Sequence, residues 1–212
     1  MKRFKTEACV ETIAQGVLAE KRGADRIELC RDLSREGLTP SDEAISEAAA
    51  RISIPIRVMI RPHDEGFYYS AEDVALMKAS IAHCKRAKLE GVVFGAMQKE
   101  KQCLDMTLIE ELTRYASPLK VTIHKVVDSC EDPLQELIRL QEIPGIDAVL
   151  TSGKSATAME GISLLKEMLS LSTDQLDVIV CGRVTNDNVS ELDQILEANF
   201  YHGKKIVGSL AS

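Results

Sequence analysis

The sequence alternates eight short segments rich in β-branched residues with longer amphipathic segments, and this alternation limits the fold more than any other feature. The centres of the first and last short segments lie about 195 residues apart, so one strand and helix unit takes about 28 residues, close to the minimum for such a unit. A pattern of this kind is typical of a parallel sheet with crossover helices. Eight even units favour a closed (β/α)₈ TIM-like barrel, because an open sheet would expose two edges.

The expected strands and helices follow one another without a linker or a low-complexity segment, so residues 1–212 are predicted to form one α/β domain. The predicted strands are Lys5–Val10, Arg26–Cys30, Ile54–Arg61, Gly91–Gly95, Lys120–His124, Ala148–Thr151, Asp177–Cys181 and Phe200–Gly203. The predicted helices are Thr12–Arg22, Asp42–Arg51, Ala71–Lys88, Asp105–Tyr115, Pro133–Gln141, Ala156–Ser170 and Asn186–Ala198.

The end of the sequence departs from this regularity. Only residues 204–212 follow the last predicted strand, which is too short for an ordinary outer helix, so we expect the last helix to be missing or incomplete. The outer flank of the last and first strands would then be uncovered. A homo-oligomer, a dimer or a tetramer, is therefore expected to cover that flank with a second subunit.

Composition excludes several classes of partner. The 26 Lys and Arg against 33 Asp and Glu give a net charge of −7, which disfavours nucleic acid because its phosphates require cationic neutralisation. No apolar run approaches the ~20 residues that span a bilayer, and the first residues lack the apolar region of a signal peptide. We therefore expect a cytoplasmic protein that binds neither nucleic acid nor a membrane. The six cysteines form no C-x-x-C pair and are expected to be free thiols.

Polar side chains concentrate where the predicted strands point into the barrel. Alternation along the strands turns the following residues inward at or near the C-terminal rim, where barrel active sites lie: Glu7, Glu28, Arg61 and His124. Burying these charges is costly, so we expect a small polar ligand there. Either glutamate could act as a general base, Arg61 could hold a carboxylate or an oxyanion, and His124 could carry a proton. The alternative is an internal Glu28–Arg61 ion pair with His124 as a satisfied core histidine.

Two inward cysteines suggest a different chemistry. Cys9 and Cys30 fall on adjacent predicted strands, and soft thiolates select Cu(I) over hard cations. The alternative is a pair of inert core thiols, because free cysteine is among the residues most often buried. Glycines at or just after the ends of the last three predicted strands, such as Gly182 and Gly203, indicate either tight turns or the phosphate site that barrels often hold there.

Short motifs along nearly the whole chain carry a family resemblance. They include EACV at 7–10, ADRIELC at 24–30, GLTPS at 37–41, MIRP at 59–62 and VTIH at 121–124. In order and spacing they resemble the CutC copper homeostasis family. The resemblance implies a cytoplasmic, oligomeric TIM-like barrel associated with Cu(I). It places the candidate copper thiol at Cys30, with Cys9 nearby, and the four polar residues of the lumen also match family motifs.

The first functional prediction is therefore a copper homeostasis protein that binds or traffics Cu(I) through Cys30 and Cys9. The alternative is a TIM-barrel enzyme of unknown reaction that acts on a small polar ligand through Glu28, Arg61 and His124. No Ser-His-Asp elbow, Walker loop, zinc-protease helix or dinucleotide fingerprint assigns a reaction to these residues.

Overall fold

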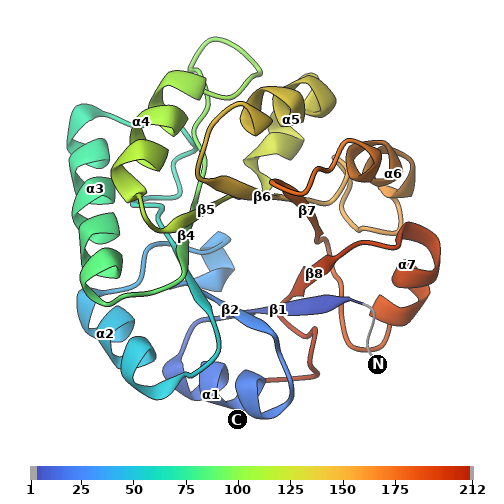
Figure 1. Ribbon diagram of the computed structural model, residues 1–212, viewed down its shortest axis with the longest axis horizontal. Coiled ribbons are helices and arrows are strands. Elements are labelled where there is room, and N and C mark those ends of the chain that lie inside the picture. Colours follow the sequence, from blue (N-terminus) through green and yellow to red (C-terminus); the bar gives the residue numbers. More distant parts are fainter. Residues whose placement is uncertain (1–3, 211–212) are drawn as a thin grey trace.

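Eight parallel strands close into a barrel in the computed structural model, which describes residues 4–210 (Figure 1). Every strand pairs with the next one along the chain, and β8 pairs with β1, so the sheet has no free edge. The strands are β1 (Lys5–Val10), β2 (Arg26–Leu29), β3 (Ile56–Met59), β4 (Gly91–Phe94), β5 (Lys120–Ile123), β6 (Ile146–Thr151), β7 (Asp177–Val180) and β8 (Phe200–Gly203). The predicted α/β barrel is confirmed.

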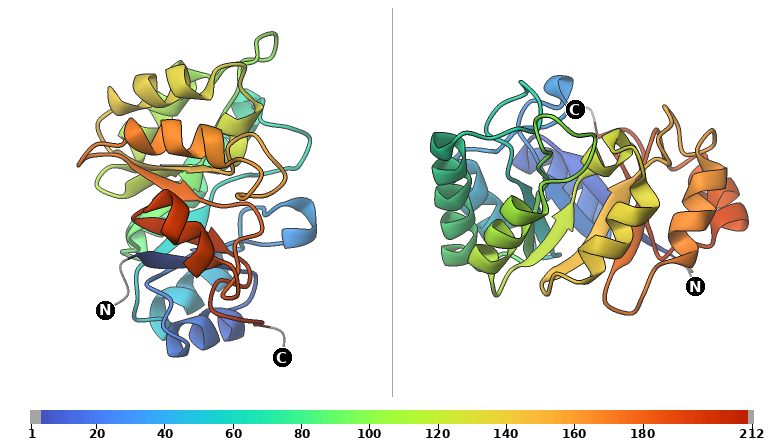
Figure 2. Two further views of the ribbon diagram at one scale, coloured as in Figure 1. Left: turned by 90° about the vertical axis from the view of Figure 1, so that its right-hand side faces the viewer. Right: turned by 90° about the horizontal axis from the view of Figure 1, so that it is seen from above.

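The helices surround the ring of strands, as Figures 1 and 2 show. Residues 4–210 contain seven α-helices and two short 3₁₀ helices. They are α1 (Ile13–Lys21), η1 (Leu33–Arg35), α2 (Asp42–Arg51), α3 (Ala71–Arg86), α4 (Met106–Ala116), η2 (Lys125–Ser129), α5 (Pro133–Gln141), α6 (Ile162–Ser170) and α7 (Val189–Leu196). Several helices are capped by side chains at their N-termini, close to where the sequence predicted that these helices begin. Ser41 accepts from the Ala44 N–H, and Ser70 and Asp73 form a reciprocal capping box.

The loop between β6 and α6 differs most from the sequence-based boundaries. The helix begins at Ile162 instead of Ala156, and residues 154–161 form turns. Ala158 donates its N–H to the carbonyl of Gly182, 2.8 Å away, so this segment is held against the end of β7 by its backbone. Smaller shifts place the start of β6 at Ile146 and that of α7 at Val189.

The flank of β8 and β1 is covered by the chain itself. No helix follows β8 in the part of the chain that the structure describes, as predicted. Tyr201 on this flank is nevertheless fully buried, with its hydroxyl donated to Asp193 on α7 and its ring packed edge-on against Phe4. The segment after β8 continues beside α1, where Arg22 binds the carbonyl of Ser209 and Leu210 joins the core (Figure 1). The expectation of a bare flank is wrong, and the homo-oligomer stays a prediction without that argument.

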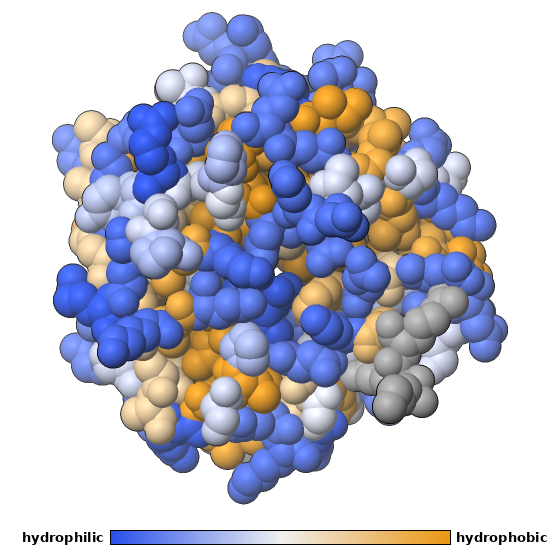
Figure 3. Space-filling view, viewed as in Figure 1, coloured by the Kyte–Doolittle hydropathy of each residue, from blue (hydrophilic) through white to orange (hydrophobic). Residues whose placement is uncertain are grey.

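The surface around the ring of strands is mostly polar on the face drawn in Figure 3, with hydrophobic residues scattered between charged ones. Among residues 4–210, no helix combines the length and the apolar character needed to cross a bilayer. The hydrophobic residues instead concentrate between the strands and the outer helices, where strand residues such as Ala8, Val58 and Ile123 are fully buried.

Candidate functional site

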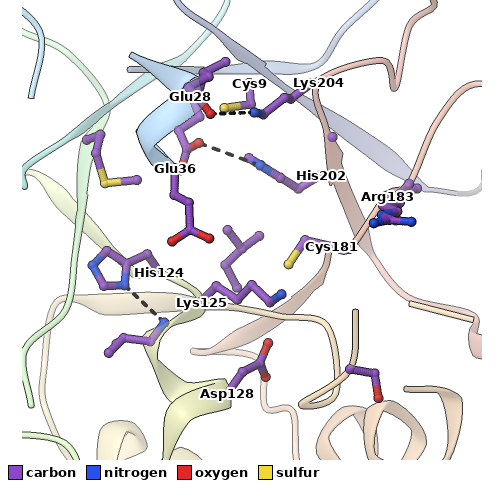
Figure 4. Close-up of a pocket in the computed structure, with 18 of the residues that line it drawn as sticks. Cys9, Glu28, Glu36, His124, Lys125, Asp128, Cys181, Arg183, His202 and Lys204 are labelled. Atoms are coloured by element: carbon purple, nitrogen blue, oxygen red, sulfur yellow. Dashed lines mark hydrogen bonds and ion pairs between the residues drawn. The ribbon is translucent and has the colours of Figure 1, made fainter. Parts of the chain in front are cut away.

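A pocket of about 810 Å³ opens at the C-terminal ends of the strands (Figure 4). Side chains at or just beyond the ends of β1, β2, β5 and β8 line it: Cys9, Glu28, His124 and His202. Residues at this rim come from distant parts of the sequence because all eight strands are parallel and end on the same side. The volume lies within the range of small-molecule sites.

The two predicted copper thiols meet at the wall of this pocket. In the β1–β2 register Cys9 lies opposite Glu28, so Cys30 sits one inward position further along the neighbouring strand. The sulfur atoms of Cys9 and Cys30 are 3.9 Å apart, and both side chains are buried. Met59 and Val93 pack against the pair in a separate apolar cluster. The alternation along the strands had predicted that Cys9 and Cys30 are inward neighbours on adjacent strands, and this prediction is confirmed.

Below the thiols, Glu7 is held between two basic side chains. It lies opposite Arg26 on β2 and His202 on β8 in the strand register, and it binds the Arg26 Nε and, at 2.9 Å, the His202 Nδ1. Burial by itself would raise the pKa of Glu7, but Arg26 and His202 lower it to about 2. Glu7 is 1% exposed and does not line the pocket, so the structure places it as a support for His202.

The surroundings of the two thiols shift the pKa values of Cys9 and Cys30 in opposite directions. A hydrogen bond from Cys30, helped by His202, holds the pKa of Cys9 well below its ordinary value although burial opposes this. The same hydrogen bond and burial raise the pKa of Cys30 well above its ordinary value. Burial alone would lower the pKa of His202, but the acidic groups around it, Glu28 foremost, raise it. Of the two cysteines, Cys9 is therefore the one whose pKa favours loss of the proton, and His202 lies beside it.

Two groups of side chains have the spacing of a metal site. Cys9, Glu28 and Cys30 offer ligand atoms within 4.8 Å of one another, as do Glu7, Glu28 and His202. Glu28 belongs to both groups. Its Oε2 lies 3.5 Å from the Cys30 sulfur and 3.7 Å from the His202 Nε2, a contact drawn in Figure 4. Burial, followed by the Cys9 charge, raises the pKa of Glu28 well above its ordinary value.

The alternative interpretation of the sequence, an ion pair between Arg61 and Glu28, is wrong. The Nη1 of Arg61 donates to the carbonyls of Arg35 and Gly37, at 3.1 and 3.4 Å, and its guanidinium lies over the ring of Phe67. No carboxylate among residues 4–210 forms an ion pair with Arg61, although only 5% of the residue is exposed. The Nε is buried without a partner.

His124 is buried but only half satisfied. Its Nδ1 accepts the Val126 N–H at 3.2 Å, whereas its Nε2 is buried without a partner among the described residues. Burial, with the charge of Arg61, lowers the pKa of His124 to about 3, so the ring is neutral near pH 7. The interpretation as a satisfied core histidine is wrong for Nε2, because that atom is buried without a hydrogen-bond partner in a residue that lines the pocket.

Three residues that matter here were given no role from the sequence. Arg26 shares the inward parity of Glu28 on β2, and His202 lies opposite Glu7 in the β1–β8 register, so strand parity turns both inward. Phe67 lies in the loop between β3 and α3, where no periodicity indicates the direction of a side chain. It nevertheless packs against both Arg61 and His124.

The opposite, N-terminal end of the barrel lumen is filled by a separate polar cluster. Arg57 is 1% exposed and binds Asp147 through both Nη atoms, at 2.7 and 2.6 Å, and Glu90 through Nε at 3.1 Å. It also donates to the hydroxyl of Thr122. These contacts satisfy the guanidinium, so the cluster holds strands β3, β5 and β6 together and offers no free group to a ligand.

The glycines after the last strands are required by close packing. A Cβ on Gly203 would lie 2.1 Å from the carbonyl oxygen of Val184, and a Cβ on Gly182 would meet the Ser152 side chain at 2.7 Å. Gly182 also has a φ of +99°, which L residues rarely adopt. These contacts favour the tight-turn interpretation over a phosphate site.

Comparison with known proteins agrees with the fold and with the family resemblance. The model of the CutC family matches residues 4–207. A family protein CutC of Photobacterium profundum is 36% identical over 189 residues, which is 89% of this chain and 76% of that protein. The human copper homeostasis protein cutC homolog is 37% identical over 196 residues, 92% of this chain and 70% of that protein. The crystal structure of a CutC protein from Streptococcus agalactiae superposes with a TM-score of 0.89 at 25% identity, covering 96% of this chain and 99% of that one.

Proposed function

Because the chain belongs to the CutC family, we propose that it serves copper homeostasis by binding Cu(I) between the thiols of Cys9 and Cys30. The observation that carries this proposal is the 3.9 Å separation of the two buried sulfurs. With metal–sulfur bonds of ~2.3 Å, two sulfurs on one ion can lie at most about 4.6 Å apart. The pair therefore fits one metal ion without movement of either strand.

The chemistry of the donors favours Cu(I) over harder cations. Thiolate and thioether sulfur are soft ligands, and Met59 lies in the same apolar cluster as Cys9 and Cys30. Hard cations such as Mg²⁺ and Ca²⁺ take oxygen ligands, of which only Glu28 is present in the thiol group. A binding site of this kind needs reduced cysteines, so we expect the protein to work in the reducing cytoplasm.

The low pKa of Cys9 supplies the first ligand in its reactive form. Metal binding requires thiolates, and Cys9 is the cysteine whose pKa is lowered. Cys30 must then lose its proton when the ion binds. The carboxyl oxygen of Glu28, 3.5 Å from the Cys30 sulfur, is the neighbouring acceptor through which that proton can leave, and Glu7 fixes the ring of His202 through Nδ1.

Anaerobic titration with Cu(I) against a colorimetric Cu(I) chelator tests the proposal. Wild-type protein is expected to bind one equivalent, and Cys9→Ser and Cys30→Ser are each expected to lose it. Cys103→Ser is the matched control, since Cys103 is the most accessible cysteine and lies outside the pocket. Far-ultraviolet circular dichroism checks that each variant is folded. Unchanged Cu(I) affinity in the double variant Cys9→Ser/Cys30→Ser would refute the site.

A second candidate function rests on the size of the pocket. A cavity of about 810 Å³ is far larger than one ion needs and suits a small organic molecule. An enzyme that uses Glu28, Arg61 and His124 on such a molecule is the alternative. Under that alternative Glu28→Gln or Arg61→Ala abolishes turnover while the fold survives, and Cys30→Ser leaves turnover unchanged.

A further inference from the structure

We propose that Arg61 and His124 form a carboxylate-binding subsite at the mouth of the pocket, for a small ligand that carries a carboxylate group. The subsite lies beyond the copper site and does not depend on it, because neither side chain belongs to the two groups that could hold a metal. Both side chains line the same pocket and pack on the same ring, that of Phe67.

One edge of the Arg61 guanidinium is free. Its Nη1 is used by the carbonyls of Arg35 and Gly37, while Nε is buried without a partner and Nη2 makes no hydrogen bond with a described residue. Nε and Nη2 form the edge that binds a carboxylate with two parallel hydrogen bonds. A guanidinium is always charged, so an unpaired one at 5% exposure is costly unless a ligand completes it.

Another arginine of this protein, Arg35, binds a carboxylate through the same Nε and Nη2 edge. Arg35 binds Asp64 through Nε, 2.5 Å from Oδ2, and through Nη2 to Oδ1. Arg35 is half exposed, whereas Arg61 is buried. The buried arginine is therefore the one that lacks the carboxylate, and it faces a cavity instead of solvent.

His124 adds a second donor beside Arg61. Since Nδ1 accepts the Val126 N–H, the ring proton is on Nε2, and this N–H has no acceptor among the described residues. The ring of Phe67 lies 4.8 Å from the Arg61 guanidinium carbon and 4.9 Å from the centre of the His124 ring. Two unpaired donors thus share one aromatic support, and a buried donor without an acceptor costs stability.

The charge of the lining also favours an anion. Figure 4 shows several of these side chains around the opening. The cationic residues of the lining outnumber the acidic ones, in a chain whose net charge is −7. The cations are Arg61, Lys125, Lys154, Arg183, Lys204 and Lys205, and the acids are Glu28, Glu36 and Asp128. Positive charge gathered at a cleft raises the local concentration of anions.

Isothermal titration calorimetry with succinate, at constant ionic strength and without copper, tests the subsite. Saturable binding of succinate to the wild type is expected. Arg61→Met should weaken it roughly 10- to 100-fold, because a charge-assisted pair of hydrogen bonds is lost. The control Arg114→Gln removes an exposed arginine on α4 and should leave the affinity unchanged.

Two further variants keep the proposal testable if Arg61→Met does not fold. Arg61→Lys keeps the charge without the planar edge and should still weaken succinate binding. His124→Asn removes the Nε2 donor and should do the same. Wild-type affinity in both variants, or inorganic phosphate binding more tightly than succinate, would overturn the carboxylate subsite. In the Cys9→Ser/Cys30→Ser variant succinate should bind as in the wild type, so failure of the copper site and failure of this subsite are distinguishable.

Discussion

Replacing His124 by Asn should make the free energy of unfolding less sensitive to acid. His124 is 5% exposed, and burial, with the charge of Arg61, lowers its pKa from 6.5 to about 3. The unfolded chain therefore binds a proton below pH 6.5 that the folded chain does not bind. Because the folded pKa is the lower one, stability is fully present above pH 6.5 and is lost as the pH falls toward 3.

The size of the effect follows from these two pKa values. Between pH 7 and pH 5 the histidine of the unfolded chain goes from about one quarter to almost fully protonated, while His124 in the folded chain stays neutral. The single group then removes about 2 kcal/mol from the free energy of unfolding. At pH 5 a folded pKa of 3 or of 4 gives nearly the same value, since the ring is neutral in both cases.

Urea unfolding at pH 5, 6 and 7, followed by circular dichroism, measures the difference. Asn at position 124 keeps an oxygen that can accept the Val126 N–H, so the variant loses the titrating ring and keeps that local hydrogen bond. The wild type should lose about 2 kcal/mol more than His124→Asn between pH 7 and pH 5. Losses that agree within about 0.5 kcal/mol would refute the reasoning, as would a nuclear magnetic resonance titration of His124 with a midpoint near pH 6.5.

Four other outcomes are expected. Gly203→Ala should destabilise the fold by about 3 kcal/mol in thermal unfolding, because its Cβ would lie 2.1 Å from the Val184 carbonyl oxygen; an unchanged melting temperature would contradict this. Arg57→Met should cost roughly 3 kcal/mol in urea unfolding, since it leaves two partly buried carboxylates unpaired, and full stability would show that they are solvated instead. Glu7→Gln should lower the pKa of His202, measured by nuclear magnetic resonance, because it removes the negative charge bound to Nδ1. Light scattering at micromolar concentration should show a dimer or a tetramer, and a monomer would contradict the predicted homo-oligomer.

The architecture could be predicted from the sequence because it depends on periodicity. Strands buried on both faces appear as short β-branched runs, and their parity identified the inward positions of Cys9, Cys30 and Glu28 correctly. The start of α6 could not be predicted in the same way. The predicted helix began at Ala156, but in the structure the Ala158 N–H is bonded to the carbonyl of Gly182 beyond β7, and a local pattern gives no sign of a contact so distant in the sequence.

The candidate site could be predicted only in part, because the alternation along a strand gives the direction of a side chain but not its contacts. Parity shows that a side chain points inward, but not which inward side chains touch. One alternative interpretation paired Arg61 with Glu28, yet Arg61 extends instead to backbone carbonyls of the loop after β2 and to the ring of Phe67. Glu7 was a candidate base, yet Arg26 and His202 enclose it below the pocket. Contacts that involve loops require the folded structure.

The pairing of β8 with β1 has a consequence for the growing chain. On the ribosome β1 is the first strand of the barrel to emerge and Phe200–Gly203 the last, so one edge of the nascent sheet has no neighbour until β8 is made. The contact between Glu7 and His202 joins residues 195 positions apart and forms only at closure. A nascent chain that stops short of β8 thus carries both Cys9 and Cys30 but no His202 beside them. Synthesis of β8, and not the appearance of the thiols, sets the moment at which the Glu7–His202 contact beside them can form.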